Sequence, residues 1–251
     1  YEVVRAVNDT DADLIYSDEA VLSSDLKRLG EFHFKPDFGP DTLRGCNFIT
    51  HLCAFSKRLV RKAGGGESCD YEGAQDYDLI LRLTENAERI VHIPKVLYFW
   101  RGHEDSTAGD IQNKPYALEA GAKAVGAHLE RVGLSGVVSG QKEHPGSYRV
   151  EYEVEGEPLV SVIIPNKDHV EDLSRCLQSL YAKAGWSNLE VLVVENNSTK
   201  KATETYYRKA QKKYSGLKVV RYSNVFNFAA ICNFGVEKAQ GDHILLLNND
   251  V

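Results

Sequence analysis

The chain has 251 residues, of which 43% are hydrophobic and 26% are charged, a balance that is ordinary for a soluble globular protein. Its formal net charge of −6 argues against an extended cationic surface for nucleic acid, and its apolar runs are far too short to span a bilayer. Five scattered cysteines without a CxxC pair indicate small buried side chains in a reducing compartment.

The first 110 residues alternate irregularly between strand and helix signals, with long polar connections. Leu79, Ile80 and Leu83 recur at helical spacing and predict a helix over residues 76–83. A loop that contains Pro and Gly is predicted over residues 32–41. Strands are predicted at residues 12–16, 48–55, 90–93 and 96–100. This is an α+β pattern.

The middle of the chain has the composition of a connection. An Ala-rich helix is predicted over residues 116–132, and the Gly and Ser residues of 133–140 are typical of a linker. Residues 148–154 alternate as an edge strand that leads into a second unit. The boundary is therefore expected within residues 112–157.

Residues 158–251 repeat strand and helix signals in the order of a parallel sheet with crossover helices. Strands are predicted at residues 160–165, 189–194, 217–220 and 244–247. Helical patterns lie at residues 170–180, 203–214 and 228–239. The fold class predicted for this part is α/β.

Polar side chains follow three of these four strands, and parallel strands present their carboxyl ends at one edge of a sheet. Taken singly, each residue is better explained as a helix cap or a turn, but three polar strand ends together favour a ligand site. No GxGxxG or P-loop sequence is present, so a nucleotide site without a glycine cradle is expected. The residues are Pro165, Asn166 and Asp168, then Glu195 and Asn196, and finally Asn248 and Asp250.

These motifs resemble the nucleotide-binding half of a family 2 glycosyltransferase with the GT-A fold. The resemblance is carried by residues 160–168, 194–199, 224–230 and 239–250, in the order of the family. It implies that the ends of the first two strands contact the nucleoside. It also implies that Asn248 and Asp250 stand at the Asp-x-Asp motif, which holds Mn²⁺ or Mg²⁺ beside the phosphates. Asn248 replaces the first acid there and should weaken the metal site.

The first part of the chain resembles the acceptor half of the same family in its tandem bacterial form. The matching blocks are residues 11–19, 34–37, 73–79 and 92–101. The resemblance makes Asp76 the catalytic base, which removes the proton of an acceptor hydroxyl. It makes His103 a third metal ligand. The alternatives are that Asp76 caps its helix and that His103 is a solvated loop residue.

The resemblance implies inverting transfer of a sugar from a nucleotide-sugar donor to a hydroxyl of a growing bacterial surface polysaccharide or lipid-linked glycan. A cytoplasmic enzyme without a nucleic-acid partner is expected, and peripheral association with the inner membrane is left open. Two other classes also remain open. They are a non-catalytic nucleotide- or glycan-binding module and a nucleotidyltransferase.

The two halves occur in reversed order, so they should serve different active sites. We expect the C-terminal, acceptor-side half of one GT-A domain at residues 1–111, a helix and linker at 112–157, and the N-terminal half of a second domain at 158–251. The chain opens on Tyr1 and contains no Met, so it is expected to be a fragment that lacks partner half-domains. A further hypothesis is that the two halves dock as one circularly permuted pseudo-domain.

Overall fold

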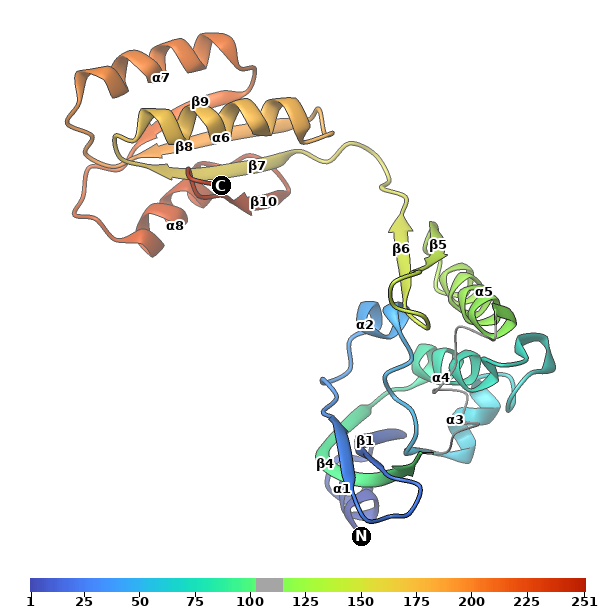
Figure 1. Ribbon diagram of the computed structural model, residues 1–251. Helices are drawn as coiled ribbons and strands as arrows, with labels where there is room; N and C mark the ends of the chain where they lie inside the picture. Colours follow the sequence, from blue (N-terminus) through green and yellow to red (C-terminus); the bar gives the residue numbers. More distant parts are fainter. Residues whose placement is uncertain (103–114) are drawn as a thin grey trace. The chain divides into compact units, whose positions relative to one another are not determined.

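The computed structural model describes residues 1–102 and 115–251, which form two compact units, Tyr1–Glu153 and Val154–Val251 (Figure 1). Each unit encloses hydrophobic clusters of its own. Among the helices of the described residues, none is long and apolar enough to cross a membrane.

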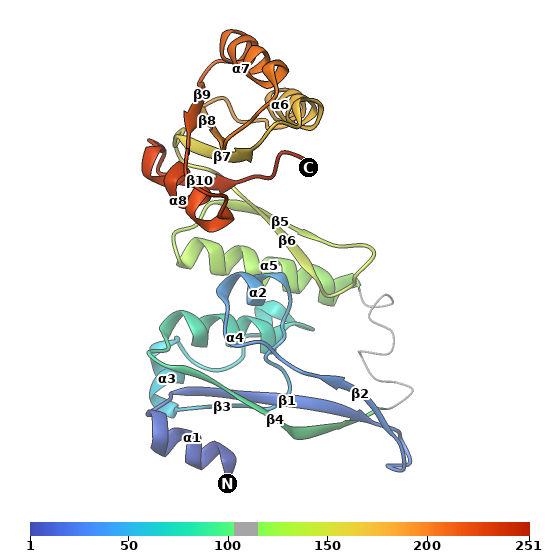
Figure 2. The ribbon, with the colours of Figure 1, turned by 90° about the vertical axis from the view of Figure 1, so that its left-hand side faces the viewer.

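The first unit is built on a four-stranded mixed sheet whose central strand, β1, is buried over most of its length. β4 pairs with β1 in parallel, and β2 and β3 pair with it antiparallel. Helix α1 lies on one face of this sheet and helix α4 on the other (Figure 2). The bounds are α1 Glu2–Thr10, β1 Leu14–Leu22, β2 Leu29–His33, β3 Cys53–Phe55, α4 Gln75–Asn86 and β4 Ile90–Arg101.

Several predicted bounds in this unit were wrong. The two strands predicted around Pro94 are one strand, β4, because irregularities in its register carry the pairing with β1 past the proline. The predicted loop at 32–41 contains the end of β2 and the start of helix α2 (Pro40–Gly45), where Pro40 occupies a first-turn position that suits its fixed φ. Two short helices follow, α3 (Lys57–Lys62) and the 3₁₀ turn η1 (Cys69–Tyr71).

The segment predicted as a linker is folded onto the first unit. Helix α5 (Pro115–Arg131) packs on α4, and the hairpin of β5 (Gly136–Gly140) and β6 (Tyr148–Tyr152) contacts α5 and α2. The two carboxylate oxygens of Glu85 on α4 accept bonds from Arg131 at 2.9 and 2.7 Å. The Gly and Ser residues of β5 hid its strand pattern, and the boundary between the units falls after Glu153.

The second unit confirms the predicted parallel sheet. Its strands lie in the order β10-β7-β8-β9, and all neighbours are parallel. Val162 and Ile164 of β7 pack with α6 and α7, whereas Ile163 packs with α8 on the opposite face. The bounds are β7 Val160–Asn166, α6 Val170–Lys183, β8 Leu189–Glu195, α7 Lys201–Lys213, β9 Leu217–Arg221, α8 Phe228–Lys238 and β10 His243–Leu246.

Close packing of α8 on the sheet leaves no room for a side chain at Gly235. A Cβ there would lie 2.4 Å from a methyl group of Ile163 and 3.0 Å from one of Val194. We expect Gly235→Ala to lower the free energy of unfolding of this unit by about 1–3 kcal/mol, measured by urea denaturation. Gly126→Ala, on helix α5 of the first unit, is the control, because a Cβ there meets nothing within 4 Å, and it should not destabilise the unit that contains it. Equal stability of Gly235→Ala and the wild type would contradict this packing.

Candidate functional site

At the carboxyl ends of the parallel strands in the second unit, several hydrogen bonds meet at Asn166, the last residue of β7. Its Nδ2 donates to the hydroxyl of Tyr207 on α7 at 2.7 Å and to the carbonyl of Asp168 at 2.9 Å. Its Oδ1 accepts a bond of 2.6 Å from Nδ2 of Asn249 in the C-terminal motif. One buried amide therefore joins the end of β7, helix α7 and the residues that follow β10.

Asp168 holds the turn that leads into α7. Its carboxylate accepts bonds from the backbone N–H groups of Lys200 at 2.9 Å and Thr199 at 3.2 Å, and from the hydroxyl of Thr203 at 2.9 Å. These bonds, that of Lys200 first, lower the pKa of Asp168 to about 2. The side chain thus organises the site edge, and its contact with a nucleotide stays a prediction.

The lowered pKa of Asp168 makes the second unit sensitive to acid. The ionised carboxylate favours the folded state above its usual pKa of 3.8, and this contribution is lost as the pH falls toward about 2. We expect Asp168→Ala to flatten the loss of stability between these pH values, whereas Asp242→Ala, at an exposed carboxylate, should not. Urea unfolding at several pH values, followed by Trp186 fluorescence in a Trp100→Phe background, measures the difference.

The end of β8 is joined to its neighbours through Asn196. Its backbone N–H donates to the carbonyl of Asn166 at 3.0 Å, and its Nδ2 donates to the carbonyls of Tyr222 at 2.8 Å and Asn224 at 3.0 Å. Asn196 is buried, so these bonds satisfy an amide that would otherwise be costly to bury. The predicted nucleoside residues Asn166 and Asn196 are therefore in direct contact.

Glu195 is buried beside Asn196 and is paired with a cation that the sequence analysis missed. Its Oε2 lies 3.3 Å from the guanidinium of Arg221, and its Oε1 accepts the backbone N–H of Ser198. Arg221 ends β9, and its place at the carboxyl end of the third predicted strand is the signal that could have found it. The pair puts a positive charge at the same edge.

The C-terminal motif lies at this edge with its predicted metal ligands exposed. Asn248 and Asp250 are open to solvent, while Asn249, which was not predicted as a site residue, bonds Asn166. A hollow of about 320 Å³ lies beside Asn248. It is lined by Pro165, Phe228, Cys232, Leu246, Leu247, Asn248 and Val251.

The two predicted metal ligands offer oxygen atoms, which suit a hard divalent cation, but they supply a single negative charge. Asp250 offers an exposed carboxylate and Asn248 an exposed amide, and Mn²⁺ or Mg²⁺ takes such oxygen ligands. Within residues 1–102 and 115–251, no group of three His, Cys, Asp or Glu side chains could hold a metal by itself. His103, the third predicted ligand, lies outside the described residues.

In the first unit, Asp76 lies exposed on the first turn of α4. Its Oδ2 accepts a bond of 3.2 Å from Nδ2 of Asn47. The N-cap residue is Ala74, which has no side-chain cap, so the alternative that Asp76 caps the helix was wrong. A carboxylate at a helix N-terminus is favoured by the helix dipole, and the exposed position leaves it free to meet a substrate hydroxyl.

A buried charged cluster around Glu19 lies in the same unit and was not predicted. Oε2 of Glu19 contacts Nζ of Lys35 at 3.2 Å and accepts the backbone N–H of His51 at 2.7 Å. Burial alone would raise the pKa of Glu19, but the bonds from His51 and the charge of Lys35 outweigh it and lower the pKa to about 2. Lys35 also donates to the carbonyls of Ile49 and Thr50.

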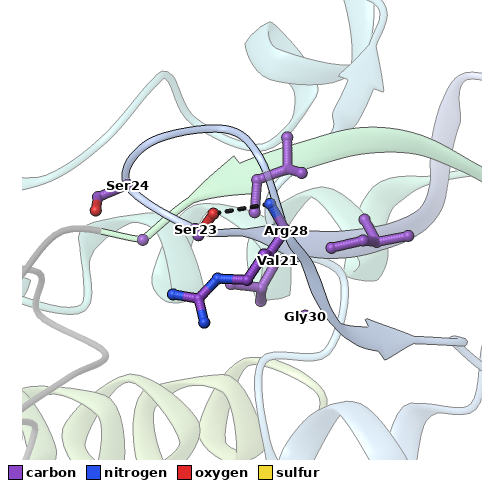
Figure 3. Close-up of a pocket in the computed structure, with 8 residues that line it drawn as sticks. Val21, Ser23, Ser24, Arg28 and Gly30 are labelled. Carbon is purple, nitrogen blue, oxygen red and sulfur yellow. Dashed lines mark hydrogen bonds between the residues drawn. The ribbon is translucent and has the colours of Figure 1, made fainter.

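A separate hollow of about 510 Å³ lies at the turn between β1 and β2 (Figure 3). Arg28 donates its backbone N–H to the hydroxyl of Ser23 at 3.0 Å, and Val21, Leu22 and Leu29 supply apolar walls. Among the residues that the structure describes, none of the predicted site residues lines this hollow.

Comparison with known proteins matches these observations. Residues 161–251 match the model of the glycosyl transferase family 2. The uncharacterized protein y4gI of Sinorhizobium fredii is 38% identical over 243 residues, which are 96% of this chain and 26% of that protein. The O-antigen biosynthesis protein RfbC of Myxococcus xanthus is 36% identical over 238 residues, which are 95% of this chain and 18% of that protein. The chain thus spans about a quarter or less of these relatives.

Two solved structures share short stretches with the chain. The mannosyltransferase PcManGT from Pyrobaculum calidifontis, in complex with GDP-Man and Mn²⁺, is 23% identical with a TM-score of 0.35, over 38% of this chain and 28% of that chain. TarS 1-349 from S. aureus, in complex with UDP-GlcNAc, is 25% identical with a TM-score of 0.33, over 37% of this chain and 26% of that chain.

The second unit is an open parallel α/β sheet with polar residues at the carboxyl ends of its strands, which is where such sheets bind ligands. Residues 161–251 match the model of glycosyl transferase family 2, which confirms the resemblance predicted for this part of the chain.

Proposed function

We propose that the protein is an inverting glycosyltransferase that moves a sugar from a nucleotide-sugar donor to a hydroxyl of a bacterial surface glycan. The observation that carries the proposal is that Asn166, Glu195 and Asn196 lie together at one edge of the sheet within the segment that matches the family. The relative from Myxococcus xanthus is an O-antigen biosynthesis protein, which supports a glycan as the acceptor.

The two units carry different parts of the chemistry. The second unit would bind the donor, with its nucleoside at the ends of β7 and β8. In the active site of its own domain, the first unit would bind an acceptor, with Asp76 taking the proton of the acceptor hydroxyl while that oxygen bonds to the anomeric carbon of a donor held by the other half of that domain. The bond from that carbon to the diphosphate oxygen breaks, and the electron pair leaves with the diphosphate.

We propose that the two units contain halves of consecutive domains, residues 1–111 within the first unit and residues 158–251 within the second. The separate cores of the two units support this division, as does the restriction of the family match to residues 161–251. Each half would then work with a half-domain from elsewhere in the protein. Docking of the two halves on one another, and action at the cytoplasmic face of the inner membrane, stay predictions.

A divalent cation fits the exposed oxygens of Asp250 and Asn248, with His103 as a further ligand. When bound, it would neutralise charge on the departing diphosphate. The single carboxylate of Asp250 predicts weak metal binding, so activity should require added Mn²⁺ or Mg²⁺ rather than survive dialysis against chelator.

The test is to incubate the full-length protein with UDP-, GDP- and dTDP-sugars and simple glycosides as acceptors, with Mn²⁺, Mg²⁺ or EDTA. We expect release of nucleoside diphosphate and a product one sugar heavier, with the opposite anomeric configuration by NMR. Binding of a donor without turnover would instead favour a non-catalytic module. Release of pyrophosphate from a nucleoside triphosphate and a sugar phosphate would favour a nucleotidyltransferase.

A further inference from the structure

The side chain of Asp76, the proposed base, needs a contact that orients it. Asp76 is exposed on the first turn of α4, and an exposed Asp side chain samples several rotamers. A general base must lie within hydrogen-bond reach of the proton it removes, and small displacements of such groups are costly. In the described part of the chain, Asn47 is the one side chain that bonds this carboxylate, at 3.2 Å from Oδ2.

Asn47 lies in a segment, residues 46–51, that is fixed at both ends. At its start, the N–H of Cys46 donates to the carbonyl of Thr42 at 3.1 Å, which ends helix α2. Within it, the hydroxyl of Thr50 donates to the carbonyl of Asn47 at 3.3 Å. Asn47 is therefore held by its own backbone and does not depend on Asp76 for its position.

The buried charges fix the other end of the segment. Nζ of Lys35 donates to the carbonyl of Ile49 at 3.2 Å, and Glu19 accepts the N–H of His51 at 2.7 Å. Ile49 is fully buried in the core that α4 shares. The buried cluster around Glu19 thus fixes the end of the segment whose Asn47 bonds Asp76.

Helix α4 is tied to the same region beside the base. The hydroxyl of Tyr77, which follows Asp76, donates to the carbonyl of Leu43 on α2. Tyr77 and Leu43 are both buried in one core with Ile49. The first turn of α4 and the segment that carries Asn47 thus pack in the same core.

The side-chain amide of Asn47 can face Asp76 in only one of its two orientations. Nδ2 donates to the carboxylate, and the reversed amide would set its oxygen against a carboxylate oxygen. In this orientation Oδ1 is buried and has no hydrogen-bond partner among the described residues. An unpaired buried acceptor lowers stability, so packing alone does not account for Asn at this position.

We propose that Asn47 is a positioning residue that holds Oδ2 of Asp76 and leaves Oδ1 directed at the acceptor hydroxyl. The inference rests on the proposed role of Asp76 as the base. Asn47 itself forms and breaks no bond in the reaction. Its contribution is to reduce the rotamers that the base samples before the proton is transferred.

The test compares Asn47→Leu, Asn47→Gln, Asp76→Asn and Asn86→Leu in the full-length protein. The substrate is the nucleotide sugar that the wild type consumes fastest in the donor panel. We expect Asn47→Leu to lower kcat by about 10- to 100-fold with little change in the KM for the donor and no fall in melting temperature. Asn47→Gln, which keeps an amide donor, should recover part of the lost kcat.

Asn86→Leu is the matched control, because Asn86 also donates its amide, to the carbonyl of Arg82 at 2.9 Å, at the far end of α4. It should leave kcat unchanged. If Asn47→Leu kept the wild-type kcat while Asp76→Asn was inactive, the positioning role of Asn47 would be overturned and the base role of Asp76 would stand. A parallel fall of kcat and melting temperature, without rescue by Gln, would also overturn it. Full activity of Asp76→Asn would instead remove the base assignment on which the inference rests.

Discussion

Asp76→Asn should lower kcat for glycosyl transfer by about 10²- to 10⁴-fold, the usual contribution of a general base. The amide is nearly the same size and still meets Asn47, but it cannot accept the proton of the acceptor hydroxyl. Because Asp76 is exposed and lies outside the core, the variant should fold and melt like the wild type. The measurement is release of nucleoside diphosphate in the presence of acceptor.

Asp9→Asn provides the control for this loss. Asp9 is an exposed carboxylate on α1, and it pairs with Arg5 of the same helix at 3.5 Å. Its removal changes the net charge by the same amount without touching α4. Comparable losses in both variants would show that charge, and not the base, determines the rate.

Lys35→Met should lower the free energy of unfolding of the first unit by about 3–5 kcal/mol, because it leaves the buried carboxylate of Glu19 without its cation. Nζ of Lys35 also donates to the carbonyls of Ile49 and Thr50, so the variant removes these two bonds to the segment of residues 46–51. Urea denaturation followed by the fluorescence of Trp100 reports on this unit in a Trp186→Phe background.

Lys95→Met is the matched variant at the surface. Lys95 lies 3.0 Å from Glu2 and is half exposed, and exposed pairs contribute at most about 1 kcal/mol. A loss in Lys35→Met no larger than that in Lys95→Met would mean that the buried cluster does not stabilise the unit.

The second unit was predictable because its strands are short, apolar and regularly spaced. β7 and β8 are buried on both faces and consist mainly of Val, Ile and Leu, and the observed ends differ by one residue from those predicted. The hairpin of β5 and β6 was not predictable in the same way. Its Gly and Ser residues resemble a linker, and its contacts with α5 and α2 are long-range.

The part of the site that lies at the ends of neighbouring strands could be predicted from the sequence. The rule that parallel strands end at one edge placed Asn166, Glu195 and Asn196 together, as observed. It gave no reason to select Asn249, whose contact with Asn166 joins residues 83 positions apart. The pairing of Glu19 with Lys35 was missed because neither sequence block contains its partner.

Titration of UDP, GDP and dTDP into the 251-residue chain tests the central claim most directly, since nucleotide binding at the sheet edge of the second unit is what the proposed function requires. Calorimetry should show one saturable site for one of the three nucleotides with Mn²⁺, weaker binding with EDTA and weaker binding in Asp250→Ala. Absence of binding for all three nucleotides with Mn²⁺, or equal affinity in Asp250→Ala and the wild type, would contradict the claim.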